Sequence, residues 1–187
     1  MIRLVVGLGN PGKGYALTRH NLGFLVVDRL VQKRRGKYTE EKADYVIATM
    51  RIASMHIRVA KPLTYMNLSG RAVKAIMNSY EIMPSELLVV SDDFAIPFET
   101  MRLRLAGSDG GHNGLASIIE SIGTEDFPRL RLGIGPIPEG RPAEEFVLES
   151  FSKEELDRLD NFTKLGSDCL EAVFYEGLTL AMNKFNR

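Results

Sequence analysis

The sequence contains a single cysteine, Cys169, among its 187 residues. One cysteine cannot form an internal disulfide, so the small secreted domains that depend on disulfides are excluded and a cytoplasmic protein is indicated. Cys169 lies within an apolar helical pattern. We therefore expect a buried, unreactive thiol rather than a catalytic nucleophile.

Long apolar runs and an excess of charge are also missing. The apolar run at the N-terminus breaks at Gly7, too early for a signal segment, and no stretch approaches the roughly 20 apolar residues of a membrane span. The 24 Lys and Arg residues balance the 24 Asp and Glu residues. A protein that coats nucleic acid without specificity is usually strongly basic, so any RNA contact must come from a local basic patch.

Short apolar runs and amphipathic helical patterns alternate along the chain. The length, with 44% hydrophobic residues, predicts one domain over residues 1–187. The expected strands cover residues 2–6, 45–50, 55–60, 87–90, 101–105 and 130–134, and the expected helices cover residues 21–32, 68–80 and 115–122. A capping box at Ser152 and Glu155 begins a C-terminal helical region that reaches residue 184 and is expected to break at Gly166. The alternation predicts an α/β fold with helices on both faces of one sheet.

The first strand is followed by a glycine-rich segment, residues 7–12, that matches the dinucleotide fingerprint G-x-G-x-x-G. A dinucleotide site would need a helix to begin within these glycines, whereas Pro11 and the following Gly-Lys-Gly favour a longer loop. The acidic residue expected about 20 positions further on is missing, and a basic run, residues 32–35, lies there. A 2′-phosphate site would accommodate that run, so a dinucleotide enzyme stays as an alternative.

Three histidines are candidates for acid–base chemistry. His56 alternates with Arg58 on one strand face, which predicts a solvated side chain. His112 lies in a Gly-Gly-His-Asn-Gly loop, where packing or loop hydrogen bonding competes with catalysis as its role. His20 lies at a helix start within reach of the Asn10 loop, and its spacing alone leaves a structural role open. No cluster has metal-ligand spacing and no G-x-S-x-G elbow presents a serine, so a hydrolase would use water with a histidine base.

Carboxylates and amides lie where strands end and helices open. Asp92 and Asp93 end a hydrophobic strand, and neighbours in an extended chain point to opposite faces, so one can orient an imidazole while the other faces away. A plain strand-end turn is the alternative. Asn10, Asn67 and Asn113 lie beside glycine-rich or helix-opening segments, where amides often serve only as caps or turn residues. Together these groups would form an uncharged, hydrogen-bonding pocket suited to a peptide and a ribose.

Four sequence blocks carry a specific resemblance. They read Gly-Leu-Gly-Asn-Pro-Gly-x-x-Tyr-x-x-Thr-Arg-His-Asn-x-Gly (7–23), Lys-Pro-Leu-Thr-Tyr-Met-Asn-Leu-Ser-Gly (61–70), Gly-Ser-Asp-Gly-Gly-His-Asn-Gly-Leu (107–115) and Phe-Pro-Arg-Leu-Arg-Leu-Gly-Ile-Gly (127–135). In this order they resemble the signatures of the bacterial-type peptidyl-tRNA hydrolase family, and the similarity extends over nearly the whole chain. The resemblance implies a single-domain, three-layer α/β/α sandwich with a mixed, mostly parallel central sheet.

The same resemblance implies the reaction. A family member hydrolyses the ester between the peptide and the 3′-terminal ribose of peptidyl-tRNA, as a monomer, without a cofactor, a metal or a membrane partner. His20 would activate the water, and Asp92 would orient the His20 ring. Asn10 would help to place the ribose and His20, while Asn67 and Asn113 would hold the peptide main chain and the hydrolytic water.

Further substrate contacts are implied by position in the blocks. Tyr15, Tyr65 and Met66 would line the substrate pocket. Arg104 and Arg131 match the basic pair that grips the 5′-phosphate of the tRNA, and a guanidinium can bind phosphate through two parallel hydrogen bonds. The sequence departs from the family at Ala95, where an acidic residue is usual. A catalytically silent RNA-binding protein on the same fold is the remaining alternative, although such a protein would not need a base and its orienting acid.

Overall fold

The computed structural model describes residues 1–42 and 44–186. The strands are β1 (Leu4–Gly7), β2 (Thr39–Lys42), β3 (Tyr45–Ile52), β4 (Met55–Pro62), β5 (Leu87–Pro97), β6 (Met101–Arg104) and β7 (Arg129–Gly135). The α-helices are α1 (Leu22–Lys33), α2 (Ser69–Tyr80), α3 (Asn113–Ile122), α4 (Ala143–Leu148), α5 (Lys153–Glu176) and α6 (Leu178–Phe185). Short 3-10 helices are η1 (Lys13–Tyr15), η2 (Arg19–Asn21), η3 (Met66–Leu68) and η4 (Pro84–Glu86).

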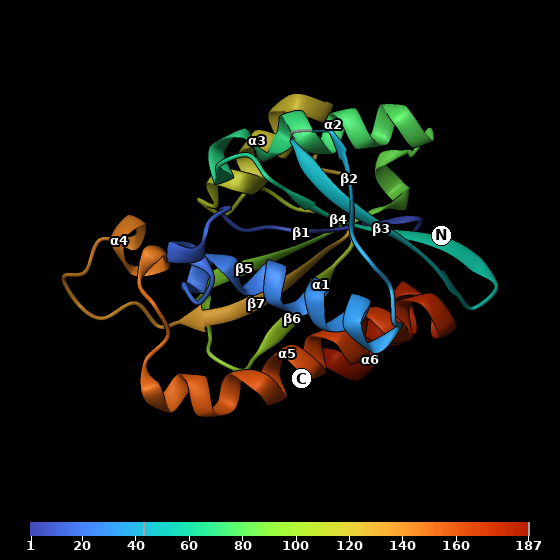
Figure 1. The fold of residues 1–187 in the computed structure, drawn as a ribbon. Coiled ribbons are helices and arrows are strands. Elements are labelled where there is room, and N and C mark those ends of the chain that lie inside the picture. The colour runs from blue at the N-terminus through green and yellow to red at the C-terminus, as the bar shows by residue number, and fades with distance from the viewer. Residues whose placement is uncertain (43, 187) are drawn as a thin grey trace.

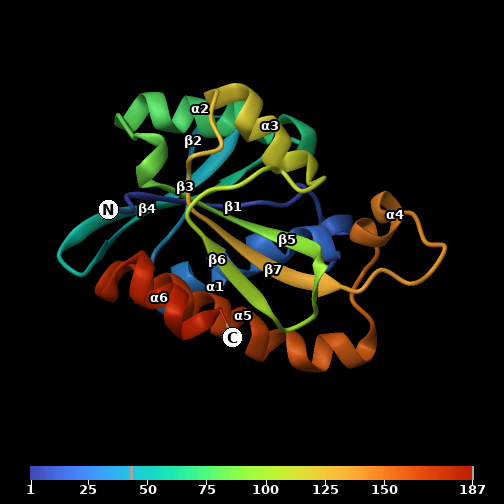
Figure 2. The ribbon, with the colours of Figure 1, turned by 180° about the vertical axis from the view of Figure 1, so that it is seen from behind.

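In the described part of the chain the strands form one seven-stranded sheet with the order β2-β3-β4-β1-β5-β7-β6. β1 pairs in parallel with β4 and β5, and β5 pairs in parallel with β7. β3 and β6 run against their neighbours, so the sheet is mixed and most strands share one direction. Helices α2 and α3 cover one face and α1, α5 and α6 cover the other (Figures 1 and 2). The predicted three-layer α/β/α sandwich is confirmed.

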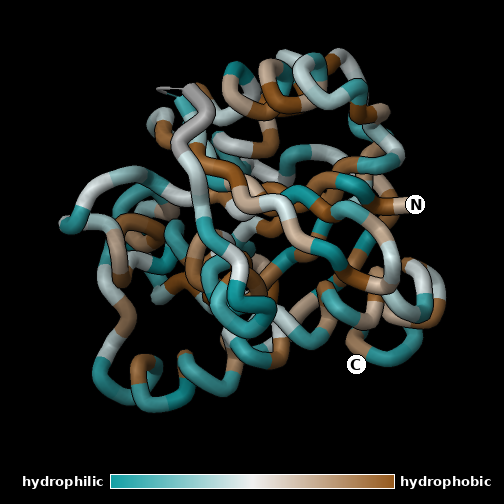
Figure 3. The backbone as a smooth tube through the Cα atoms, turned by 45° about the vertical axis from the view of Figure 1, so that its right-hand side comes forward, coloured by the Kyte–Doolittle hydropathy of each residue, from teal (hydrophilic) through white to brown (hydrophobic). Residues whose placement is uncertain are grey.

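The core consists of two apolar layers, one on each side of the sheet. Alternate residues of β1 supply both, since Val5 packs with α1 and α5 while Leu4 and Val6 pack with α2 and α3. A strand buried on both faces needs apolar residues at successive positions, which explains the short apolar runs in the sequence. Along the peripheral helices hydrophobic and hydrophilic residues alternate (Figure 3), as expected of helices with one buried side.

The C-terminal helices differ from the prediction at one point. Ser152 and Glu155 form the expected capping box, but α5 runs without a break through Gly166. A Cβ atom at Gly166 would lie 2.9 Å from Val26 Cγ2, so this glycine allows α5 to pack closely on α1 instead of ending the helix. The predicted break was wrong, and the chain turns at Gly177, whose φ of 88° suits a residue without a side chain.

One strand and one α-helix were not predicted. They are β2, at the edge of the sheet, and the short helix α4. Cys169 is fully buried, and burial raises the pKa of its thiol to about 12, as expected for an unreactive cysteine. None of the helices in the described residues is long and apolar enough to cross a membrane.

Candidate functional site

Groups that are far apart in the sequence meet near the carboxyl ends of the central strands β1 and β5. β1 ends at Gly7 and leads into the loop that carries Asn10, while β5 carries Asp92. Because β1 and β5 are parallel neighbours, these segments lie side by side. His20 lies in η2 directly before α1, and His112 is the residue before α3.

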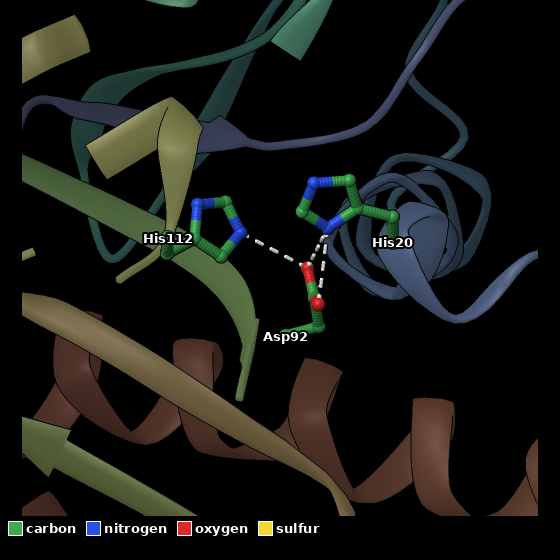
Figure 4. A group of neighbouring side chains, drawn as sticks. All are labelled: His20, Asp92 and His112. Atoms are coloured by element: carbon green, nitrogen blue, oxygen red, sulfur yellow. Dashed lines mark hydrogen bonds and ion pairs between the residues drawn. The ribbon is translucent and has the colours of Figure 1, made fainter. Parts of the chain in front are cut away.

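His20 and Asp92 form a buried hydrogen-bonded pair (Figure 4). His20 Nδ1 lies 2.9 Å from Asp92 Oδ1 and 3.1 Å from Oδ2, and the two residues are only 6% and 2% exposed. An ionised carboxylate can only accept hydrogen bonds, so the ring proton is on Nδ1 and Nε2 is the nitrogen left to accept a proton. The pair thus has the arrangement of a general base held by an orienting acid.

His112 is a second imidazole that contacts Asp92. Its Nε2 lies 3.0 Å from Asp92 Oδ1, and its Nδ1 accepts hydrogen bonds from the backbone N–H groups of Gly114 and Leu115 at 3.1 and 3.3 Å. Because Nδ1 accepts from two amides, the proton of this ring is on Nε2 and is donated to Asp92. The loop hydrogen bonding considered for His112 is confirmed. The sequence did not indicate that the same ring also holds the carboxylate.

The surroundings shift the pKa values of His20 and Asp92 in opposite directions. Burial alone would lower the pKa of His20, but the charge of Asp92 and its hydrogen bond outweigh burial and raise that pKa above the ordinary value. Burial alone would raise the pKa of Asp92, but His20 and His112 lower it well below the usual range of a carboxyl. Asp92 therefore stays ionised wherever His20 titrates, and it stabilises the imidazolium that forms when His20 accepts a proton.

Asn10 is held rigidly beside this pair. Its backbone N–H donates to Asn21 Oδ1 at 2.8 Å, and Asn21 Nδ2 donates back to the carbonyl of Asn10 at 2.9 Å. The Asn10 side-chain oxygen accepts a hydrogen bond from the backbone N–H of Met66 at 2.8 Å. With that oxygen engaged, the amide NH₂ of Asn10 is the group that can turn to a ligand. Asn21, which braces the loop, was not singled out from the sequence.

The predicted substrate residues other than Arg104 and Arg131 surround one cleft of about 500 Å³. His20 opens onto it, and Asp92 lies behind His20 and is not part of the lining. Seven lining residues were expected from the sequence: Asn10, Tyr15, His20, Tyr65, Met66, Asn67 and Asn113. Tyr65 is 60% exposed, whereas Met66 is buried at the base of the same segment.

A further wall of the cleft was not predicted. Glu144, Val147 and Leu148 of α4 also line it, and we call these three residues the α4 wall. The helix has only six residues and lies in a stretch rich in Pro, Gly and Glu. Such a short helix leaves no clear period in the sequence, although Pro142 directly before it is a usual helix-start signal.

The two predicted phosphate-binding arginines lie in a second, smaller cavity of about 200 Å³. Arg104 of β6 and Arg131 of β7 both line it, together with the loop over residues 106–110. Arg131 Nε donates to Asp93 Oδ2 at 2.5 Å, so Asp93 points away from His20, as strand alternation predicted. In the described part of the chain only the Nε of Arg131 is engaged, by Asp93, so its two terminal nitrogens remain available to an anion.

A third arginine, Arg129, also lines this cavity and was overlooked. It is almost completely buried, and its terminal nitrogens donate to the backbone carbonyls of Ser108 and Glu125 at 2.7 and 3.0 Å. Arg129 therefore fixes the loop that forms one side of the cavity. It lies opposite Arg104 in the β6–β7 register, so the two side chains share a sheet face.

The glycine-rich segment after β1 does not form a dinucleotide site. The described chain passes from this segment through η1 and η2, and the first α-helix begins only at Leu22. A Cβ atom at Gly9 would lie 2.7 Å from the ring of Phe24, so this glycine permits close packing of α1 on the loop. The helix N-terminus that a pyrophosphate would need is absent from these glycines, which overturns the dinucleotide alternative.

Comparisons with known proteins agree with this geometry. The peptidyl-tRNA hydrolase family profile matches residues 4–187. A peptidyl-tRNA hydrolase from Elusimicrobium minutum is 46% identical over 189 residues, covering 100% of both chains. Another from Chloroflexus aurantiacus is 46% identical over 184 residues, covering 98% of both. The crystal structure of peptidyl-tRNA hydrolase from Acinetobacter baumannii is 33% identical with a TM-score of 0.92, and the match covers 99% of this chain and 94% of that chain.

Proposed function

The chain belongs to the peptidyl-tRNA hydrolase family, and we propose that His20 is the base with which it cleaves its substrate. The protein hydrolyses peptidyl-tRNA, releasing the tRNA and the peptide. The observation that supports His20 is its Nδ1–H bond to the buried Asp92 at the edge of the cleft, which leaves Nε2 free to accept a proton. With this pair in place, the alternative of a catalytically silent RNA-binding protein loses its basis.

The reaction needs a water molecule, a base and hydrogen-bond donors for the developing oxyanion. His20 Nε2 takes a proton from water as the water oxygen bonds to the ester carbonyl carbon. Asp92 stabilises the imidazolium. When the intermediate collapses, the bond between the carbonyl carbon and the ribose oxygen breaks, and His20 returns the proton to that oxygen. Free tRNA and a peptide carboxylic acid result, and His20 is neutral again.

The amides of the cleft would supply the donors. Asn67 and Asn113 are exposed and lie on the cleft, Asn67 within η3 and Asn113 at the start of α3. They can hold the peptide main chain and the attacking water, while the NH₂ group of Asn10 faces the ribose and keeps it near His20. Tyr15, Tyr65 and Met66 provide part of the apolar lining, beside Val147 and Leu148 of α4. We propose that the protein acts as a monomer with one domain, and that it works in the cytoplasm, where peptidyl-tRNA arises.

We further propose that hydrolysis is independent of a metal ion or other cofactor. His20, Asp92 and His112 have ligand atoms within 4.8 Å of one another, the spacing of a possible metal site. Our proposal is supported by the hydrogen bonds of this group, because His20 Nδ1 and His112 Nε2 both bond to Asp92, and a metal ion would have to displace these bonds and their protons.

Chelation tests this proposal. We expect a minimal substrate, an N-acetyl-aminoacyl ester of the terminal nucleotides, to be hydrolysed at the same rate before and after treatment with EDTA. The short substrate avoids effects of magnesium on tRNA folding. Loss of turnover with EDTA and its return with a divalent metal would contradict the metal-free mechanism.

Arg104 and Arg131 are proposed to bind the 5′-phosphate of the tRNA. Replacing either with alanine should raise the KM for full-length peptidyl-tRNA and leave turnover at saturation mostly unchanged. The dependence of binding on salt should become shallower by roughly one unit or less per lost contact. Steady-state kinetics at several salt concentrations would measure both effects.

The control for the arginines is the same minimal ester, which lacks the 5′-phosphate. The penalty of each alanine variant should vanish on it. An equal loss on full tRNA and on the fragment would mean that these arginines support the fold or the cleft, and the phosphate contact would be wrong.

A further inference from the structure

Arg19 is a buried cation directly beside His20 that has no part in the chemistry above. It is only 7% exposed. One terminal nitrogen donates to the carbonyl of Ser150 at 3.0 Å, and the other donates to Glu155 Oε2 at 2.7 Å. Glu149 adds a second carboxylate at 3.6 Å. With two carboxylates beside it, the charge of Arg19 is compensated within its own contacts, so its effect on His20 is small.

The contacts of Arg19 reach α4. Its guanidinium lies over the ring of Phe146, an α4 residue, at 4.5 Å from the ring centroid. The neighbouring backbones are joined as well, since the Arg19 N–H donates to the carbonyl of Glu149 and the Phe151 N–H donates to the carbonyl of Leu17. In both ribbon views α4 lies beside the segment that carries η2 (Figures 1 and 2). Arg19 thus joins the segment of His20 to the segment of α4.

The two sides of α4 have different surroundings. Phe146 is buried against Arg19, whereas Glu144, Val147 and Leu148 line the cleft. A helix of six residues has little stability of its own, so its place depends on the tertiary contacts that hold it. Leu148 is 47% exposed and, together with Val147, gives the cleft an apolar surface.

We propose that Arg19 is a positioning residue that holds the α4 wall against the His20 segment, so that Val147 and Leu148 form the site for the side chain of the amino acid esterified to the tRNA. This inference rests on the proposed function of the cleft. Val147 and Leu148 suit an apolar side chain, whereas the hydroxyl groups of a ribose need hydrogen-bonding groups such as the amides of the cleft. Arg19 therefore governs which acyl groups bind well, and not the proton transfer.

Arg19→Lys is the sharpest variant, because lysine keeps the charge. One ammonium group cannot reproduce the planar fork that reaches Ser150 and Glu155 while lying over Phe146. For N-acetyl-leucyl-tRNA we expect KM to rise by about three- to tenfold, within the range for residues that act through a neighbour. KM for N-acetyl-glycyl-tRNA, turnover at saturation and the pH profile should all stay within about twofold of the parent.

Arg29→Lys is the matched control. Arg29 also forms an ion pair with α5, through Asp160 at 2.6 Å, but within the described residues its hydrogen bonds all go to Asp160 and none to α4. The Arg29→Lys variant should leave the ratio of the KM for N-acetyl-leucyl-tRNA to the KM for N-acetyl-glycyl-tRNA unchanged. Leu148→Ala should lose the same preference for the leucyl substrate, and adding it to Arg19→Lys should have little further effect, because both changes remove the same wall.

Hydrogen–deuterium exchange supplies a readout that does not depend on activity. Exchange over residues 143–151 should be faster in Arg19→Lys than in the parent and unchanged in Arg29→Lys. Equal KM increases for both substrates, a lower turnover with a shifted pH profile, or unchanged exchange over α4 would each overturn the role of Arg19. Failure of the parent protein to hydrolyse either substrate would instead refute the proposed function, while the exchange result would still report on α4.

Discussion

His20→Ala is expected to lower the turnover of peptidyl-tRNA by at least about a hundredfold, the usual scale for the loss of a positioned base. The fold should be kept, because the ring makes its main contact with Asp92 and packs at the edge of the cleft rather than in either apolar layer. KM should change little, since His20 acts on the water. Steady-state hydrolysis of N-acetyl-aminoacyl-tRNA would measure turnover and KM, and circular dichroism of the variant would test whether the fold is kept.

The control for this variant is another histidine. His56 lies exposed on β4, as the sequence predicted, and His56→Ala should hydrolyse the substrate like the parent. Near-normal turnover of a folded His20→Ala variant would refute the assignment of the base. A similar loss of turnover in both variants would mean that the loss in His20→Ala is not specific to His20, and the assignment of the base would fail.

Asp92→Asn is expected to lower turnover less than the loss of His20 does, with substrate binding largely kept. An amide cannot stabilise the imidazolium. Its NH₂ group also takes the place of one of the two oxygens near His20 Nδ1, at 2.9 and 3.1 Å, and can favour the tautomer in which Nε2 carries the proton. In that tautomer the ring cannot accept a proton from the water.

The pH profile separates this role from simple packing. The charge of Asp92 raises the pKa of His20, and the base must be unprotonated to act. Removing the charge should lower that pKa, so the acidic limb of kcat/KM against pH should move to lower pH. Asp93→Asn is the comparison, because Asp93 contacts Arg131 and should alter KM for full tRNA rather than the acidic limb. A shift of the acidic limb in the Asp93 variant alone would show that the wrong carboxylate was assigned.

The candidate site shows which features can be predicted from sequence and which cannot. Strand alternation correctly separated Asp92 from Asp93, since it depends only on the period of extended chain. Strand alternation could not indicate which of the two carboxylates points toward His20, because that depends on the side of the sheet on which α1 packs. The role of His112 was equally open, since the partners of its two nitrogens come from β5 and from the start of α3.

The unpredicted parts share a physical cause. Gly166 matched a helix-breaking signal locally, but its close contact with Val26 of α1 keeps α5 continuous. The position of α4 depends on Arg19, more than 120 residues earlier in the chain, and not on a period of its own residues. Local patterns contain neither contact.

By itself the sequence determined the α/β class and most strands and helices, because periodicity and turn chemistry are local. Its motifs and the family resemblance that they carry identified seven residues of the cleft, but not the α4 wall. Only the tertiary structure decided how those groups pair. The hydrogen bond from His20 to Asp92 spans 72 residues, and Arg131 of β7 is joined to Asp93 of the neighbouring strand β5. Arg19 holds α4 against the His20 segment. These pairings follow from the order of strands in the sheet and from the side on which each helix packs, which are set by burial of the whole core.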